Sequence, residues 1–210
     1  MKRTERKFKP LGRSVSKRIP KRKIVIYSEG EKTEPDYFEA VRKHIKDLLI
    51  DIDIVDGAGV PLTIAKEASK AAREFRRINR KQSYAESDEF WAVFDRDEHP
   101  NISDAIQLCE STNVGVALSD PCFEVWLILH FQEFDRPDDR HQVQRHLETI
   151  CTDYNRNRRK TTDCDKLIAQ MEKAEERAEV QLKRRNSEGN TPSRPFTTVF
   201  QLTRRIRGIL

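Results

Sequence analysis

Short apolar runs alternate with amphipathic segments in the first two thirds of the chain. The runs are rich in branched and aromatic residues and end in polar ones, which is typical of buried strands. They cover residues 23–28, 51–55, 89–94 and 114–119. The segments between them place apolar residues on one face and predict helices over residues 35–49, 62–82 and 102–110. Strands that alternate with helices predict an α/β fold whose mainly parallel, four-stranded sheet is flanked by helices.

A further apolar run follows Pro121 and predicts a buried helix, because proline fits the first turn of a helix. Within this run, Glu124 is a charge among aromatic and aliphatic residues. A lone buried carboxylate costs free energy, so we expect a cation or hydrogen-bond donors beside Glu124.

Beyond Phe134 the chain becomes more polar and its remaining pattern is helical. The prediction is a linker over residues 135–140, helices over 141–151, 163–186 and 197–210, and a Gly/Pro-rich break over 187–195. The helix from Asp163 is charged on most sides and could lie on its own core or cross to another subunit of a homo-oligomer. The predicted organisation is a flexible arm (residues 1–22), an α/β core (residues 23–134) and a helical C-terminal extension (residues 135–210).

The net charge of +5 and the pI near 9.0 arise from a local excess of lysine and arginine. The first 23 residues contain a single acid, Glu5, and the helix predicted over residues 62–82 has a basic exposed side. Such segments suit a polyanion such as nucleic acid. A disordered solubilising tail and an ordinary solvated helix face are the alternatives.

The cysteines indicate a reducing compartment. Cys109, Cys122, Cys151 and Cys164 form no Cys-x-x-Cys pair, which fits structural thiols better than disulfides or a zinc site. No apolar stretch is long enough to span a membrane, and the N-terminus has no apolar region typical of a signal peptide. We therefore expect a cytoplasmic protein with no membrane partner.

Acidic residues follow two of the predicted strands. Glu29 ends the first strand, and Asp95 and Asp97 end the third. If these strands are adjacent and parallel, the three carboxylates meet at one edge of the sheet. Carboxylates without a neighbouring His or Cys pair suit Mg²⁺ or Mn²⁺, whereas the alternative is a solvated acidic turn. Additional candidate ligands are Glu34, Glu98 and Glu124.

Glu29-Gly30 after one strand and Asp95-x-Asp97 after another resemble the TOPRIM domain of topoisomerases, primases and OLD-type nucleases. The chain more closely resembles the RloB-like family, small TOPRIM proteins linked to abortive phage defence. The segments that carry this resemblance are residues 27–38, 93–99, 119–127 and 190–192. The resemblance implies a TOPRIM-like core over residues 23–134.

The resemblance also implies roles for individual residues. Glu29 corresponds to the TOPRIM glutamate, as metal ligand or general acid/base, and Asp95 and Asp97 correspond to the metal-binding pair. OLD-type nucleases use another acid shortly after the first glutamate, and Glu34 is the nearest match, one residue farther along. Those nucleases also use a late lysine. Lys160 is the candidate, and the alternative, which the pattern favours, is a solvated member of a basic run.

The hypothesis from the sequence is a Mg²⁺- or Mn²⁺-dependent nuclease that cleaves RNA, including transfer RNA, or DNA in anti-phage defence, with an AAA-type ATPase as partner. His99 is a candidate proton shuttle. One alternative is a phosphohydrolase of the haloacid-dehalogenase type with Asp95 as nucleophile. Against it, the Asp-x-Asp motif ends the third strand rather than the first, and His99 stands where that family has threonine. The other alternative is a non-catalytic nucleic-acid-binding or sensor subunit.

Overall fold

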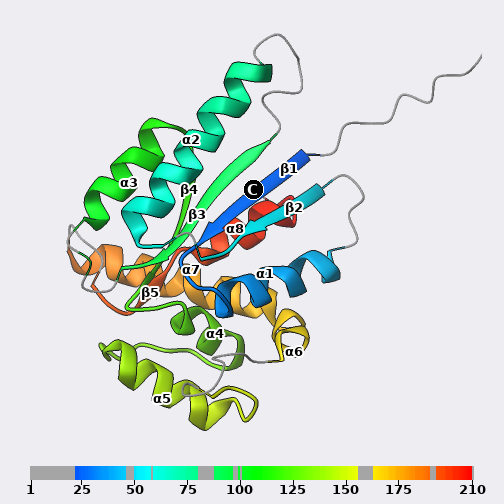
Figure 1. Cartoon of the computed structure of the whole chain (residues 1–210). Coiled ribbons are helices and arrows are strands. Elements are labelled where there is room, and N and C mark those ends of the chain that lie inside the picture. Colours follow the sequence, from blue (N-terminus) through cyan, green and yellow to red (C-terminus); the bar gives the residue numbers. More distant parts are fainter. Residues whose placement is uncertain are drawn as a thin grey trace, which may run out of the picture.

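The computed structural model describes residues 22–45, 50–57, 59–79, 88–96, 99, 101–155, 163–189 and 193–209. In this part of the chain, a five-stranded sheet is covered by helices on both faces (Figure 1). The strands are β1 (Arg22–Ser28), β2 (Ile50–Val55), β3 (Glu89–Asp95), β4 (Gly115–Asp120) and β5 (Phe196–Thr197). The first four are parallel, so the prediction of a mixed α/β fold with a mainly parallel sheet is confirmed.

The strand order is β2-β1-β3-β4-β5, which places β1 directly beside β3. In the register of this pair, Ser28 lies opposite Val93, so both strands end at the same edge of the sheet. The adjacency that the sequence argument required is therefore confirmed. The residues that follow β1 and β3 share one edge.

The prediction of four strands is wrong, because β5 adds an antiparallel strand beside β4. Thr197 pairs with Ser119, and their hydroxyl groups lie 2.9 Å apart. A strand of two residues shows no periodicity in sequence, and it lies where a helix start was predicted. Only its tertiary contact with β4 defines it. Thr197 consequently belongs to the sheet, and the last helix begins at Val199.

The helices form two layers. One face of the sheet is covered by α2 (Pro61–Asn79) and α3 (Ile102–Ser111). The other carries α1 (Thr33–His44), α4 (Glu124–Phe131), α7 (Met171–Glu188) and α8 (Val199–Ile206), with α5 (Arg140–Ile150) and α6 (Cys164–Ile168) outside them (Figure 1). Side chains alternate between the faces. Ile24 and Ile26 join the core beneath α1 and α4, whereas Val25 joins the core beneath α2.

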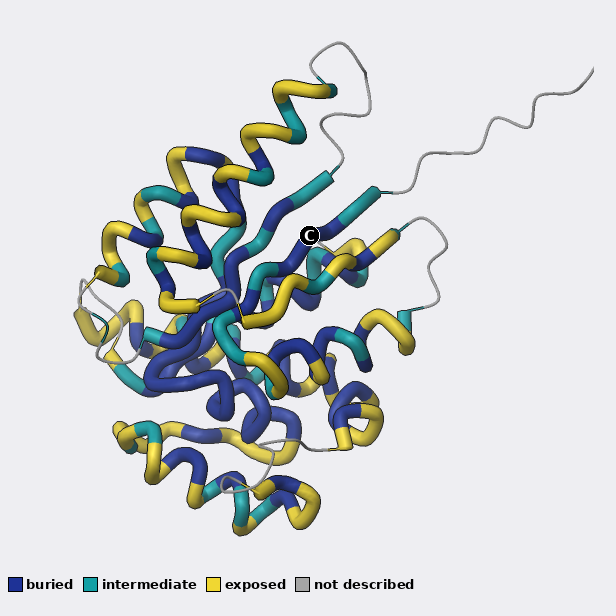
Figure 2. Tube along the Cα trace, viewed as in Figure 1, coloured by how far each residue is buried: buried dark blue, intermediate teal, exposed yellow. Residues whose placement is uncertain are grey.

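Helix α4 lies at the centre of the larger layer, and every residue from Glu124 to His130 is buried (Figure 2). The predicted buried helix is thus confirmed. The long helix predicted from Asp163 is instead two helices, α6 and α7, separated by a turn at Ala169 and Gln170. The turn lets α6 pack against α1 while α7 packs against α4. The buried face of α7 lies on the core of its own chain.

All four cysteines are free and buried, as expected for structural thiols. Within the described residues, no helix combines the length and apolar composition that a membrane span requires.

Candidate functional site

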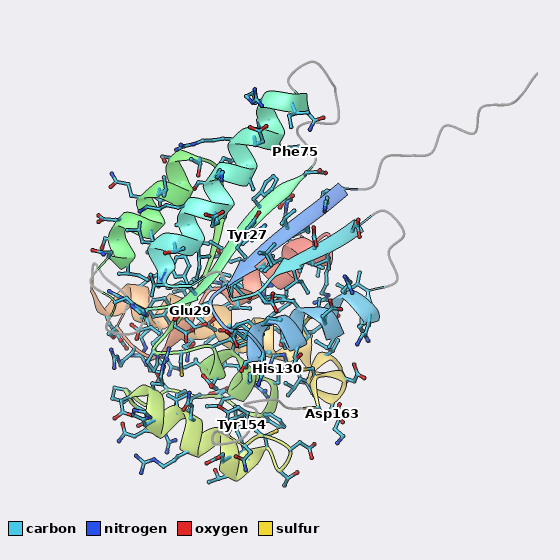
Figure 3. All side chains as sticks on the ribbon, in the orientation of Figure 1. Tyr27, Glu29, Phe75, His130, Tyr154 and Asp163 are labelled. Carbon is cyan, nitrogen blue, oxygen red and sulfur yellow. The ribbon has the colours of Figure 1, made fainter. Side chains whose placement is uncertain are left out.

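The side chain of Glu29 lies over the end of the neighbouring strand β3 (Figure 3). Its backbone N–H donates to the carbonyl of Val93 at 3.2 Å, which continues the β1–β3 ladder. Its carboxylate then accepts the backbone N–H of Asp95 at 3.3 Å. The parallel pairing therefore brings Glu29 and Asp95 together at the carboxyl edge of the sheet.

Glu34 enters the same edge from the first turn of α1 and is buried, with 6% of its surface exposed. It packs directly on the backbone of Gly30, at the turn after β1. A Cβ atom at position 30 would lie 2.0 Å from Glu34 Oε2, so the carboxylate of Glu34 would have to move. Glycine at position 30 therefore has a steric role, because it leaves room for a second carboxylate, that of Glu34.

We predict that Gly30→Ala lowers the free energy of unfolding by about 1–3 kcal/mol, because the carboxylate of Glu34 must leave its buried position. Urea unfolding measures the change. In a Glu34→Ala background the same substitution meets no carboxylate, so the two effects should be less than additive. Full additivity would show that Glu34 does not pack on Gly30.

Glu124 reaches this edge from the start of α4, and it has the donors that its burial required. Its Oε1 atom accepts the hydroxyl of Tyr154 at 2.7 Å and the amide of Gln144 at 3.0 Å. Burial and then the neighbouring Glu124 raise the pKa of the Tyr154 phenol, so this hydroxyl remains a donor. Tyr154 follows α5 (Figure 3), so α5 and the segment after it orient the carboxylate of Glu124.

Arg140 is a residue of this site that the sequence pattern did not reveal, as are Gln144 and Tyr154. Its Nη2 atom donates to Asp95 Oδ2 at 2.7 Å from the first turn of α5. Sequence pattern assigned Arg140 to a polar linker, although the capping box formed by Asp139 and Gln142 marks a helix start there. That capping signal would have placed Arg140 on a helix, but only the fold shows which carboxylate it meets.

Two carboxyl groups at this edge, those of Asp95 and Glu34, have raised pKa values. Burial, and then the charges of Glu34 and Glu124, raise the pKa of Asp95 well above its usual range, while Arg140 acts in the opposite direction. Burial is also the largest cause that raises the pKa of Glu34 to about 7, with further contributions from Glu124 and Glu29. An acid cluster of this kind, formed by Glu29, Glu34, Asp95 and Glu124, favours a bound cation or retained protons.

The pKa of Glu34 predicts a pH-dependent stability. The folded state holds the Glu34 proton up to about pH 7, whereas the unfolded state loses it near 4.5. Glu34 therefore contributes stability below pH 4.5 that is lost as the pH rises through 7, up to about 3 kcal/mol. We expect Glu34→Gln to reduce the fall in unfolding free energy between pH 5 and pH 8, as measured by urea denaturation in EDTA.

The matched control is Glu176→Gln, which alters an exposed glutamate of α7. This variant should lose stability with pH as the wild type does. An equal fall in the wild type and in Glu34→Gln would contradict a raised pKa at Glu34.

A family model described as RloB-like protein matches residues 24–206. The chain belongs to the RloB-like family. The match runs from β1 to α8 and includes the acid cluster and Arg140. No curated protein and no solved structure matches this chain.

The remaining site candidates of this RloB-like protein differ in their placement. His99 lies at the cluster, with Nε2 3.5 Å from Glu29 Oε1. Arg96, the residue between the two aspartates of the Asp-x-Asp motif, is no candidate ligand and points to β4, where its Nη1 atom lies 3.5 Å from Asp120 Oδ2. Asp97, Glu98 and Lys160 fall outside the described residues.

Among the residues that the structure describes, no three His, Cys, Asp or Glu side chains lie close enough together to hold a metal ion. Asp97 and Glu98, the two acids that follow Arg96, are not among the described residues. The chemistry of the described donors does suit a hard cation, because carboxylates from β1, α1, β3 and α4 lie at the same edge of the sheet.

Proposed function

We propose that this RloB-like protein is a nuclease that depends on Mg²⁺ or Mn²⁺ and that its α/β core is TOPRIM-like. The observation that carries the proposal is the meeting of Glu29 and Asp95 at the ends of two adjacent parallel strands. The order of these acids along the chain is that of the TOPRIM domain. Asp97 and Glu98 are proposed to complete the ligand set with Glu29, Glu34, Asp95 and Glu124.

Each group of the cluster has a task in this mechanism. A divalent cation, when bound, activates water and stabilises charge on the phosphodiester. Glu29, with His99 3.5 Å away, accepts or returns a proton as water attacks phosphorus and the P–O bond to the leaving oxygen breaks. Glu34 and Glu124 contribute negative charge that favours the cation, and Arg140 holds Asp95 in place. We propose Lys160 as a further phosphate contact.

The substrate that we propose is RNA, including transfer RNA, or DNA, cleaved as part of anti-phage defence with an AAA-type ATPase as partner. The basic side of α2 supports a polyanionic substrate, and the family resemblance supports the defence role. Purified protein, alone and with the partner ATPase, is incubated with end-labelled RNA and DNA in Mn²⁺, Mg²⁺ or EDTA. Cleavage that requires the cation is the expected result, and intact RNA and DNA under every condition would contradict it.

One observation favours a second candidate, a non-catalytic nucleic-acid-binding subunit. The guanidinium of Arg140 lies 2.7 Å from the carboxylate of Asp95, so the charge of Asp95 is balanced without a metal. Nucleic-acid binding that persists in Asp95→Asn, with no cleavage by the wild type, would support this candidate. Release of phosphate from small phosphomonoesters would instead support a haloacid-dehalogenase-type phosphohydrolase.

A further inference from the structure

Four exposed cations lie on one side of α2. Lys66, Lys70, Arg73 and Arg77 follow one another at intervals of four, three and four residues, which places them on one stripe of the helix. At 1.5 Å per residue the stripe is about 16 Å long. We call these four residues the basic stripe.

Most of the basic stripe has no ion-pair partner in the part of the chain that the structure describes. With the residues described by the structure, Lys66, Lys70 and Arg73 form no ion pair or hydrogen bond, whereas Arg77 binds Glu74 at 2.7 Å. Cations of other surfaces are commonly paired, as in Lys23–Asp53 at 2.9 Å and Lys183–Glu179 at 2.7 Å. Three successive cations that form no ion pair repel one another, although Glu67 and Glu74 lie on the same helix, and a polyanion would relieve that repulsion.

The stripe borders a groove of about 470 Å³ between α2 and α3, whose other wall includes Leu108. Polar contacts hold α2 against the end of α3. Arg76 donates to the carbonyls of Thr112 and Asn113 at 2.6 and 3.1 Å, and the hydroxyls of Ser69 and Thr112 lie 2.8 Å apart. The four cations therefore lie on a helix that these contacts hold in place, and not on a loop.

The position of α2 connects this surface with the acid cluster. The N–H of Gly57, in the loop that leads from β2 to α2, donates to the carbonyl of Gly30 at 3.3 Å. The helix then runs back along the sheet, away from the edge that carries the acids (Figure 1). Lys66 is consequently the member of the basic stripe nearest to that edge, and Arg77 is the farthest.

We propose that the basic stripe binds the phosphodiester backbone of the nucleic acid whose cleavage the acid cluster performs. This inference rests on the proposed function for its substrate class. A nucleic-acid strand carries one phosphate per about 3.4 Å of a duplex axis, so the stripe matches the length of about five successive phosphates. Lysine and arginine on a helix face bind phosphates without reading sequence, so the stripe positions the substrate.

The test compares two triple variants of the full chain with the wild type. The first removes the unpaired cations of the stripe: Lys66→Gln, Lys70→Gln and Arg73→Gln. The control removes the same charge from exposed lysines of α1 and α7: Lys43→Gln, Lys173→Gln and Lys183→Gln. Binding to fluorescent RNA and DNA duplexes of about 20 base pairs, longer than the stripe, is measured in EDTA over a series of salt concentrations.

The stripe variant should bind at least about tenfold more weakly than the wild type. The slope of log K, the logarithm of its binding constant, against the logarithm of the salt concentration should be less steep by about 2 to 3. The control variant should stay close to the wild type. An equal loss in both variants, an unchanged affinity in the stripe variant, or no binding by the wild type would overturn the inference.

The proposed function is decided by a separate readout. Wild-type hydrolysis of a small activated phosphodiester in Mn²⁺ involves a substrate too short to reach from the acid cluster along the stripe. Failure of that reaction and of nucleic-acid cleavage would contradict the nuclease, whatever the binding comparison shows for the stripe.

Discussion

Asp95→Asn is expected to lower Mn²⁺-dependent cleavage about 10³-fold, which corresponds to roughly 4 kcal/mol of transition-state stabilisation. Asparagine has the shape of aspartate and can still accept the hydrogen bond from Arg140, but it lacks the charge that a hard cation requires. The effect should therefore appear in the rate, whereas the fold is retained. Glu29→Gln is expected to reduce the rate to a similar extent, because it removes the neighbouring carboxylate.

Single-turnover cleavage with saturating protein separates this loss from a loss of binding. Asp104→Asn, an exposed acid in the first turn of α3, is the matched control and should cleave at the wild-type rate. If Asp95→Asn cleaves within about threefold of the wild type at equal binding, Asp95 has no part in the chemistry.

Arg140→Gln is expected to lower the free energy of unfolding by about 2 kcal/mol at pH 8, because it leaves Asp95 charged and buried without its partner. The cost falls below that of a fully buried pair, since 29% of the Arg140 side chain is exposed. At pH 5 the loss should be smaller. The pKa of Asp95 is already raised in the folded protein, and removing Arg140 raises it further, so protonation relieves the unpaired charge.

Urea denaturation in EDTA at both pH values measures these differences. Arg145→Gln, on the exposed side of the same helix, controls for the loss of a positive charge on α5. Arg140→Lys should retain part of the stability. Equal stability of Arg140→Gln and the wild type at pH 8 would show that Asp95 does not depend on this ion pair.

The sequence pattern was sufficient to predict those parts of the site that follow directly from a recognisable strand or helix. Branched apolar runs identified β1 and β3, and the carboxyl-edge rule for parallel sheets then placed Glu29 beside Asp95. Glu124 was identified by its charge within an apolar run, because burial of such a group requires donors. Each of these inferences depends on local sequence and on one general property of α/β sheets.

The partners of these acids could not be derived in the same way. Arg140, Gln144 and Tyr154 lie in a polar part of the chain, and they reach the cluster only because α5 packs against α4. The two-residue strand β5 likewise depends on its contact with β4. Tertiary contacts between segments far apart in sequence leave no periodic pattern, so a single sequence does not reveal them.

The most direct measurement is the anomalous scattering of Mn²⁺ in a crystal of the protein soaked with that ion. The proposed function predicts a peak within about 2.5 Å of carboxylate oxygens of Glu29 and Asp95, and its absence in crystals of Asp95→Asn. Crystals that bind Mn²⁺ only elsewhere, with Arg140 still 2.7 Å from Asp95, would contradict a metal-dependent nuclease at this edge of the sheet.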